Sequence, residues 1–402
     1  MRLFLLCFLL VSNQVVAQSL SPDHSALRSA LETRLLQIEV ELQNADKEIA
    51  LPDINFDGEL LKVGGVHADV PLLRAKLLSY GLDESFEADP HLYDNNLFEV
   101  AKKYQTEHGL KADGILGSST LAHLNKSLED EKRQIETNLH RLNSVEWFDR
   151  PDLRIEVDIA RYWLKAYEDG EVVFEMPVVV GSPERPTNIF MTTMTGVRLN
   201  PGWTLPPTIK TEDYIPKLRE DPQWVADKGV QIYTSWEKDA EPIDPTTVDW
   251  AFLSDNEIKA MRFYKNAGTS NPLGKYRFLM NNRYDIYLHD TNKKYLFDRA
   301  ARARSSGCVR VPNPQRIAEF LLKDDFGWTM EKLDEVMVSN ETKDLGAKRS
   351  IPVYFDYKTV WLNKGKKLVL GHDIYGLDAD SYRDMIEKVQ IIEKNDQKTL
   401  EE

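Results

Sequence analysis

Apolar residues recur with helical spacing through the first third of the chain. Between Asp23 and Ile49 they fall at every third or fourth position, which predicts an amphipathic helix with one buried stripe. The stripe consists of Leu27, Leu31, Leu35, Ile38 and Leu42. Three shorter helices are predicted farther on, and a charged helix with a few apolar positions is predicted to follow as a connector. These four segments span residues 71–78, 97–108, 118–124 and 127–145.

From Leu153 the periodicity changes from helix to strand. Alternating apolar and polar residues predict strands at 154–159, 162–167 and 172–180, with Asp169-Gly170 as a hairpin turn. Short strands and turns continue to Leu199, and a further strand is predicted over 284–288. Beyond them the pattern predicts a helix at 314–322, an apolar strand at 351–357 and short strands near the C-terminus.

An aromatic-rich stretch, about residues 204–264, interrupts the strand pattern. It contains helical signals and a set of large rings, namely Trp224, Trp236, Trp250 and Phe252. Such an insertion is expected to fold over a substrate as a lid and to exclude water. The rings also have a simpler use as the insertion's own small core, and the two interpretations are compatible.

Composition places the chain outside cytosolic and nucleic-acid-binding classes. Met1–Ala17 has a basic start, an apolar run and small residues at its end, which predicts a signal peptide and export to the periplasm. No later segment is apolar enough to cross a bilayer. The formal net charge of −14 gives no support for nucleic-acid binding. The 402 residues suggest two to three domains.

Cysteine usage adds the first chemical signal. Cys7 lies inside the predicted leader, so Cys308 is the single thiol of the exported chain and no disulfide framework is possible. A lone cysteine is most often a small buried hydrophobe. Here His289 lies upstream at the end of a predicted strand, and an imidazole is the usual means of deprotonating a thiol.

The residues around Cys308 support a catalytic interpretation. Ser305, Ser306 and Gly307 are small and allow a tight turn before the sulfur. Such a turn can direct the amides of Gly307 and Cys308 toward one point, where an oxyanion would be stabilised. Asp290 follows His289 directly and points to the opposite face of a strand, so a backbone carbonyl is the expected partner of the imidazole.

The run from His289 to Arg310 resembles the signature of the L,D-transpeptidase (YkuD-type) family. That signature is a His, a spacer and then Ser/Thr-x-Gly-Cys followed by an apolar residue and Arg or Asn. The resemblance implies Cys308 as nucleophile and His289 as base, with Ser305, Ser306 and Arg310 contacting substrate. Many members have a second His where this chain has Ser306, a departure that fits a subgroup of larger periplasmic enzymes with a capping insertion. In that subgroup a Tyr two residues before the His donates to the oxyanion, which implies Tyr287.

A second resemblance lies upstream. The run Tyr-Gln-x-x-His-Gly-Leu-x-x-Asp-Gly-x-x-Gly-x-x-Thr-Leu, from Tyr104 to Leu121, resembles peptidoglycan-binding module 1. The resemblance implies a three-helix unit that contacts the cell wall. A structural spacer that binds nothing is the open alternative.

The resulting expectation is a multidomain α+β protein with an all-β YkuD-type catalytic domain, a capping insertion and a small helical N-terminal module. The expected segments are a signal peptide (1–17), a helix and loop (18–65), the module (66–126), a connector (127–150), the catalytic domain (151–340) and a C-terminal extension (341–402). The resemblance implies 3→3 crosslinking of peptidoglycan stem peptides through a Cys308 thioester. The alternatives are an L,D-carboxypeptidase and a non-catalytic wall-binding protein. No cofactor is expected, and no His, Cys or carboxylate cluster has the spacing of a metal site.

Overall fold

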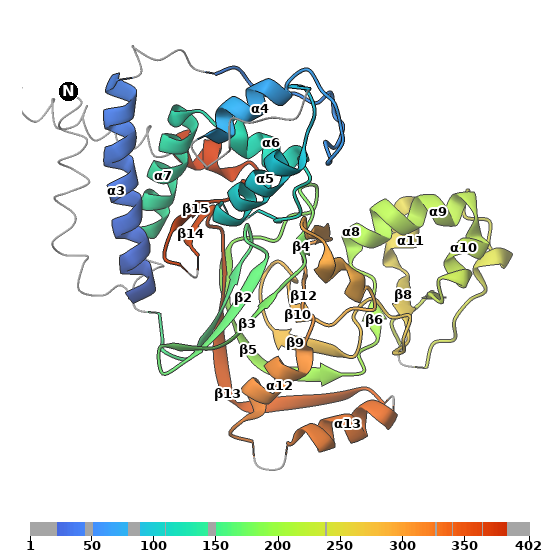
Figure 1. Ribbon diagram of the computed structural model, residues 1–402. Coiled ribbons are helices and arrows are strands. Elements are labelled where there is room, and N and C mark those ends of the chain that lie inside the picture. The colour runs from blue at the N-terminus through green and yellow to red at the C-terminus, as the bar shows by residue number, and fades with distance from the viewer. Residues whose placement is uncertain are drawn as a thin grey trace, which may run out of the picture. The chain divides into compact units, whose positions relative to one another are not determined.

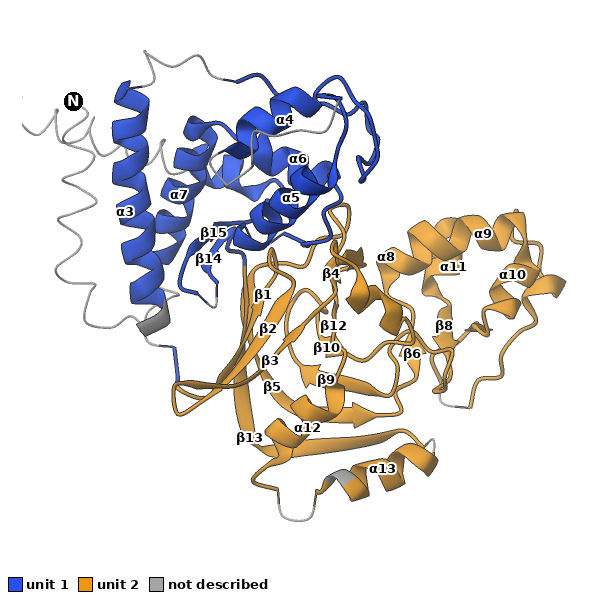
Figure 2. Ribbon diagram, viewed as in Figure 1, with its two compact units in different colours: residues 1–151, 357–402 blue, residues 152–356 orange. Residues whose placement is uncertain are grey.

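The computed structural model describes residues 22–44, 51–78, 89–108, 110–143, 150–237, 239–325, 328–339, 341–363 and 365–383. The chain forms two compact units, which Figure 2 shows in separate colours. Unit 1 comprises residues 1–151 and 357–402, and unit 2 comprises residues 152–356. The expected signal peptide and Cys7 lie outside the described residues. Among the helices in the described ranges, none is long and apolar enough to cross a bilayer.

One core of unit 1 joins segments that are distant in sequence. Helix α3 (Pro22–Asn44) packs with α7 (Leu128–Leu142) and with the hairpin of β14 (Val360–Leu362) and β15 (Leu368–Leu370). The stripe predicted on α3 is buried here, with Leu42 partly covered at its end. Gln134 of α7 donates to the carbonyls of Thr359 and Gly371, which fixes the helix against the hairpin.

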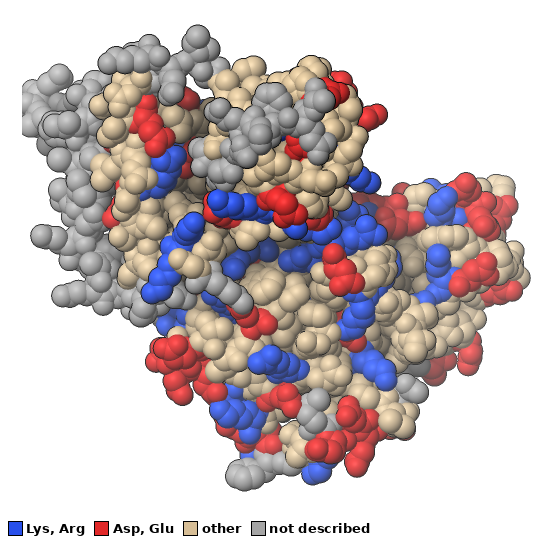
Figure 3. All heavy atoms as spheres, in the orientation of Figure 1, with Lys and Arg blue, Asp and Glu red and all other residues tan. Residues whose placement is uncertain are grey.

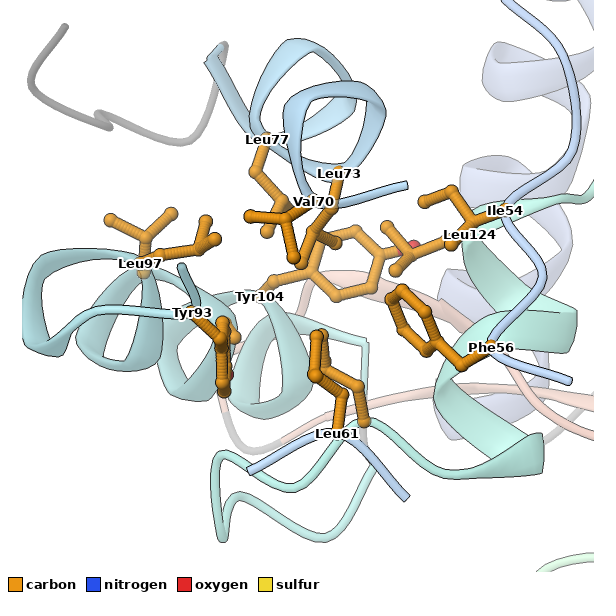
Figure 4. Close-up of a cluster of buried hydrophobic side chains, with 13 residues drawn as sticks. Ile54, Phe56, Leu61, Val70, Leu73, Leu77, Tyr93, Leu97, Tyr104 and Leu124 are labelled. Carbon is orange, nitrogen blue, oxygen red and sulfur yellow. The ribbon is translucent and has the colours of Figure 1, made fainter. Parts of the chain in front are cut away.

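The second core of unit 1 is the helical module, drawn close-up in Figure 4. It contains α4 (Val70–Leu77), α5 (Asn95–Glu107) and α6 (Ser118–Leu124), close to the predicted helices. Ile54, Phe56 and Leu61 from the preceding segment complete this core, so the predicted loop contributes to the module. Gly114 has φ 66° and its missing Cβ would overlap the ring of Phe98, so the turn after α5 requires glycine.

Unit 2 is built on an eight-stranded mixed sheet with the order β12-β10-β9-β5-β13-β1-β2-β3 (Figure 1). The predicted hairpin is present, because Asp169 and Gly170 have φ values of 53° and 79° between β2 and β3. The sheet strands are β1 (Arg154–Asp158), β2 (Trp163–Glu168), β3 (Glu171–Pro177), β5 (Phe190–Leu199), β9 (Tyr276–Met280), β10 (Leu288–His289), β12 (Val309–Arg310) and β13 (Lys343–Asp356). Outside the sheet lie β4 (Val180–Gly181), β11 (Ala303–Ser305), the short helix η6 (Lys294–Asp298), α12 (Pro314–Leu322) and α13 (Met330–Ser339).

Strand β13 corrects the expected end of the catalytic domain. Residues 341–356 were assigned to a C-terminal extension, but β13 pairs in parallel with β1 and antiparallel with β5 in the middle of the sheet. Ile351, Val353 and Phe355 are buried in the pairing. The local sequence shows an apolar strand but not its partners, which lie about 150 to 200 residues away. The sheet therefore ends at Asp356.

The insertion has its own small core beside the sheet. Trp203, Trp250 and Phe263 are buried in it, whereas Trp236 and Phe252 are 60% and 87% exposed. The core interpretation therefore holds for only part of the aromatic set. The elements are β6 (Trp203–Thr204), α8 (Pro207–Ile209), the π-helical turn η4 (Lys210–Tyr214), α9 (Ile215–Glu220), α10 (Pro222–Asp227), β7 (Gln231–Tyr233), η5 (Pro245–Thr247), α11 (Asp255–Ala260) and β8 (Arg262–Lys265).

Charged side chains of both signs are interspersed over the face drawn in Figure 3. The net charge of −14 is therefore not gathered into one acidic patch on that face.

Candidate active site

Three strands at one edge of the sheet bring the motif residues together. Strand β10 pairs in parallel with β12, with His289 opposite Arg310, and antiparallel with β9, with His289 opposite Arg277. The amides of Val309 and Val311 donate to the carbonyls of Tyr287 and His289 at 3.1 and 2.9 Å. The pairing explains why Cys308, 19 positions after His289 in sequence, lies directly before the strand that pairs with it.

The register also fixes which side chains share a face. Residues directly opposite each other in a sheet project to the same side, and alternate residues of one strand do likewise. Tyr287 and His289 therefore lie on the same face as Cys308 and Arg310. The rings of Tyr287 and His289 are 5.7 Å apart between centroids. Four of the predicted site residues thus form one group.

The turn before Cys308 is held by hydrogen bonds within the loop. Ser305 Oγ donates to the Cys308 carbonyl at 2.6 Å and accepts from the Gly307 amide at 3.2 Å. Thr187 Oγ1 donates to the Gly307 carbonyl at 2.7 Å, and Gly307 has φ 108°, a conformation that favours glycine. Ser305 is buried and both of its hydrogen bonds lie within the loop, so its contact with substrate stays a prediction. The Gly307 amide is likewise engaged inside the loop.

The Cys308 thiol is protonated in this environment. Its Sγ lies 3.6 Å from the Asp285 carbonyl, to which the thiol donates. Burial raises the pKa of Cys308 to about 11, whereas hydrogen bonds from Tyr287 and the charges of Arg277 and Arg310 act in the opposite direction. Burial also raises the pKa of the Tyr287 hydroxyl, so this group stays a neutral donor beside the sulfur. Removing the thiol proton therefore requires a base.

His289 is a neutral base in the same group. Its side chain is 4% exposed, and Nδ1 has no hydrogen-bond partner. Burial, together with the charges of Arg310 and Arg277, lowers the pKa of His289 to about 3, against the opposing effect of hydrogen bonds with the backbone of Asp290 and Leu273. The Asp290 carboxylate accepts from the Lys275 amide and from Lys294, so its contacts lie elsewhere, as expected. One ring nitrogen of this buried imidazole is open to a proton, and the lowered pKa makes His289 a weak base in the empty site.

Two arginines near the site were missed by sequence reasoning. Arg277 stacks over the Tyr287 ring, with its guanidinium carbon 4.3 Å from the ring centroid. It occupies the polar phase of strand β9, which in a sequence is indistinguishable from a solvent-facing position. The only available signal was its place in the run Pro272-Leu-Gly-Lys-Tyr-Arg-Phe278, which precedes the motif and has the Pro-Leu-Gly-x-x-x-Phe pattern of the family that the motif resembles.

Arg185 is the second missed residue. Its guanidinium donates to Ser306 Oγ at 3.2 Å and forms ion pairs with Glu212 and Asp213 of η4. It therefore links the cysteine loop to the insertion. Nothing in the local sequence around Arg185 indicates this contact, because its partners come from two distant segments.

Within the described ranges, no three His, Cys, Asp or Glu side chains are grouped so that they could hold a metal ion. The site chemistry described above rests on the thiol, the imidazole and their neighbours.

Comparison with known proteins identifies the two parts of the chain. The family described as "L,D-transpeptidase catalytic domain" matches residues 152–338, and the family described as "Putative peptidoglycan binding domain" matches residues 66–124. A curated protein of Haemophilus influenzae, "Putative L,D-transpeptidase", is 35% identical over 248 residues, which cover 61% of this chain and 48% of that protein. The chain thus spans about half the length of this relative.

Solved structures of two L,D-transpeptidases are also similar. The enzyme from Mycobacterium smegmatis is 12% identical, with 51% of this chain and 58% of that chain covered and a TM-score of 0.25. The enzyme from Stackebrandtia nassauensis is 14% identical, with 76% and 97% covered and a TM-score of 0.24. On the family matches, the chain carries an L,D-transpeptidase catalytic domain of the YkuD family and a module of the peptidoglycan-binding family.

Proposed function

We propose that this protein is an L,D-transpeptidase that forms 3→3 crosslinks between peptidoglycan stem peptides. The observation that carries the proposal is the group of Cys308, His289 and Tyr287 on one face of the β10–β12 edge. A thiol, a neutral imidazole and a neutral hydroxyl donor are the three parts that acyl transfer through a thioester needs. The signal-like leader supports a periplasmic location for this reaction.

The first step acylates the enzyme. His289 takes the proton of Cys308, and Sγ bonds to the carbonyl carbon of the third residue of a stem tetrapeptide. The carbon–nitrogen bond to the terminal D-Ala then breaks, and His289 returns the proton to the leaving amine. The Tyr287 hydroxyl and the Cys308 amide stabilise the oxyanion, each by about 3 kcal/mol. The Gly307 amide can donate to the oxyanion only if its hydrogen bond to Ser305 Oγ breaks.

The second step releases the enzyme. The amine of a second stem attacks the thioester carbon, an amide bond forms, and the thiolate leaves and recovers the proton that the amine loses. Attack by water at the same carbon gives the L,D-carboxypeptidase alternative. Exclusion of water by the insertion, tied to the cysteine loop through Arg185, favours transfer to an amine.

Incubation of the purified protein with a disaccharide tetrapeptide tests this function. Transfer predicts a dimer with the mass of two substrates minus one alanine, with 3→3 linkage in the fragment spectrum. Hydrolysis predicts a disaccharide tripeptide instead. Recovery of substrate alone from a folded preparation would rule out both reactions and favour the non-catalytic alternative.

Acylation by a carbapenem is a further expected outcome. A β-lactam carbonyl is strained and electrophilic, and its oxygen would occupy the position of the peptide oxyanion. Intact mass spectrometry should show one drug equivalent, and digestion should place it on the peptide containing Cys308, because the mature chain has one thiol.

Cys308→Ser is the control for this adduct. A hydroxyl is a much weaker nucleophile than a thiolate, so little or no adduct is expected. An equal yield on Cys308→Ser, or an adduct on a lysine of the unmodified protein, would contradict the assignment of the nucleophile.

We also propose that unit 1 anchors the protein to peptidoglycan. A cavity of about 900 Å³ lies between the helical module, α7 and the segment after β15, and its lining includes His123, Lys126, Arg133 and Tyr382. Burial lowers the pKa of Lys126, whose ammonium donates to Gln134. Asp130, Asp373 and Asp378 also line the cavity and their charges act on Lys126, but among the residues described none of them is within ion-pair distance of it. We therefore propose Lys126 as a contact for a carboxylate of the wall polymer.

Lys126→Gln should therefore weaken binding to purified sacculi several-fold while turnover of a soluble tetrapeptide fragment stays unchanged. Pull-down of sacculi at matched ionic strength measures the binding. Lys102→Gln is the matched control, because Lys102 is a lysine of the same module that lies outside the cavity and pairs with Glu99. Equal loss in both variants would point to general charge attraction.

A further inference from the structure

Two partly buried arginine side chains flank the base without a carboxylate partner. Arg277 lies opposite His289 on β9 and Arg310 lies opposite it on β12, so the imidazole sits between them on the same face of the sheet. The Nε atom of each guanidinium is buried and has no hydrogen-bond partner. Among the described residues, neither guanidinium forms an ion pair, and stacking on Tyr287 is the interaction that Arg277 makes.

This arrangement is costly unless an anion completes it. A buried cation loses hydration, and proteins generally offset that loss with a paired carboxylate or with hydrogen bonds. Nearby acids are engaged by other partners: Asp344 pairs with Arg198, and Asp290 accepts from Lys294. The guanidinium groups of Arg277 and Arg310 thus lie beside the nucleophile, and among the described residues no carboxylate pairs with either of them. A carboxylate matches the planar geometry of a guanidinium.

We propose that Arg277, together with Arg310, binds the free terminal carboxylate of the donor peptide. This inference rests on the proposed function, in which the donor ends in D-Ala. When the carbonyl carbon of the third residue contacts Cys308 Sγ, the terminal carboxylate lies about 4 Å farther along the backbone. Arg310 follows Cys308 by two residues on the same face, a step of roughly 6.6 Å. Arg277 approaches from β9, across the Tyr287 ring.

The position of His289 gives this binding a second consequence. The charges of Arg277 and Arg310 oppose protonation of the imidazole in the empty site. A carboxylate held between the two guanidiniums offsets both charges and stabilises the imidazolium that forms when Cys308 loses its proton. Only a donor with a free terminal carboxylate would then promote the deprotonation of Cys308, the thiol that attacks it. A peptide that is amidated or extended at this position lacks that carboxylate.

The test compares the disaccharide tetrapeptide with the same compound carrying a C-terminal carboxamide. For the unmodified protein we expect kcat/KM to be about 30-fold or more higher with the free acid, in line with loss of one charged hydrogen-bonded pair. In Arg277→Gln the ratio of kcat/KM for the acid to kcat/KM for the amide, both measured with this variant, should fall to near one. Arg277→Lys should recover part of the preference, because it keeps the charge but loses the fork.

Arg304→Gln serves as the matched control, because Arg304 is an exposed arginine of β11 that donates to the Ala301 carbonyl. It should retain the full preference for the acid. Equal turnover of acid and amide by the unmodified protein would overturn the inference and leave the proposed function intact. An equal loss on both donors in Arg277→Gln, with no recovery in Arg277→Lys, would make Arg277 a structural residue and also overturn it. Turnover of neither donor by the unmodified protein would overturn the proposed function and this inference with it.

Discussion

Cys308→Ala is expected to abolish crosslinking, with a loss of about 10⁴-fold or more, while both units remain folded. Cys308 is the one cysteine outside the predicted leader, so no second thiol is expected to form the thioester. The sulfur contacts the Asp285 carbonyl at 3.6 Å and Tyr287, and loss of these weak contacts should cost only about 1 kcal/mol of stability. The dimer product measured by mass spectrometry reports the reaction, and thermal unfolding followed by circular dichroism reports the fold.

The loop around Cys308 gives this experiment its control. Thr187→Val removes the hydrogen bond to the Gly307 carbonyl but keeps the thiol, so it should reduce the rate without abolishing it. Dimer formation by Cys308→Ala at more than a trace level would remove the thiol from the mechanism.

His289→Ala is expected to lower the rate of acylation by about 10² to 10⁴-fold, because no other base accepts the thiol proton. His289 is buried, so His289→Asn should be measured beside it to separate loss of the base from loss of packing. The time course of carbapenem adduct formation by intact mass isolates this step from acceptor binding.

His372→Ala is the matched control for the base. His372 is exposed and belongs to unit 1, whereas His289 belongs to unit 2, so the change should leave acylation unaffected. Comparable losses in the two alanine variants would contradict the assignment of His289. Full activity in His289→Asn would do so as well.

Local patterns predicted most helices and strands, because each depends on residues close in sequence. The stripe of α3, the turn at Asp169-Gly170 and helix α12 at 314–322 are confirmed. The pairing of strands that are distant in sequence was not predicted. Strand β13 was recognised as apolar but was assigned to an extension, since its neighbours β1 and β5 are encoded far upstream.

The candidate site shows the same difference between residues that are close in sequence, which were predicted, and residues from distant segments, which were not. Cys308, His289, Tyr287 and Arg310 share one contiguous motif, and the register places them on one face. Arg277 and Arg185 come from other segments, and their roles depend on strand pairing and on the placement of the insertion. Ser305 was expected at the substrate, and the two hydrogen bonds that hold it inside the loop depend on three-dimensional geometry.

The division of unit 1 between the two ends of the chain has a consequence for how the protein is made. Helices α3 and α7 emerge early in synthesis, but the hairpin that completes their core emerges more than two hundred residues later, as the Gln134–Thr359 contact illustrates. Until then the apolar faces of these helices are open to solvent and to wrong partners. With the export that the leader predicts, a chain of this design is expected to depend on holdase chaperones during translocation. Short C-terminal truncations that remove β15 should lower its yield by exposing the N-terminal helices.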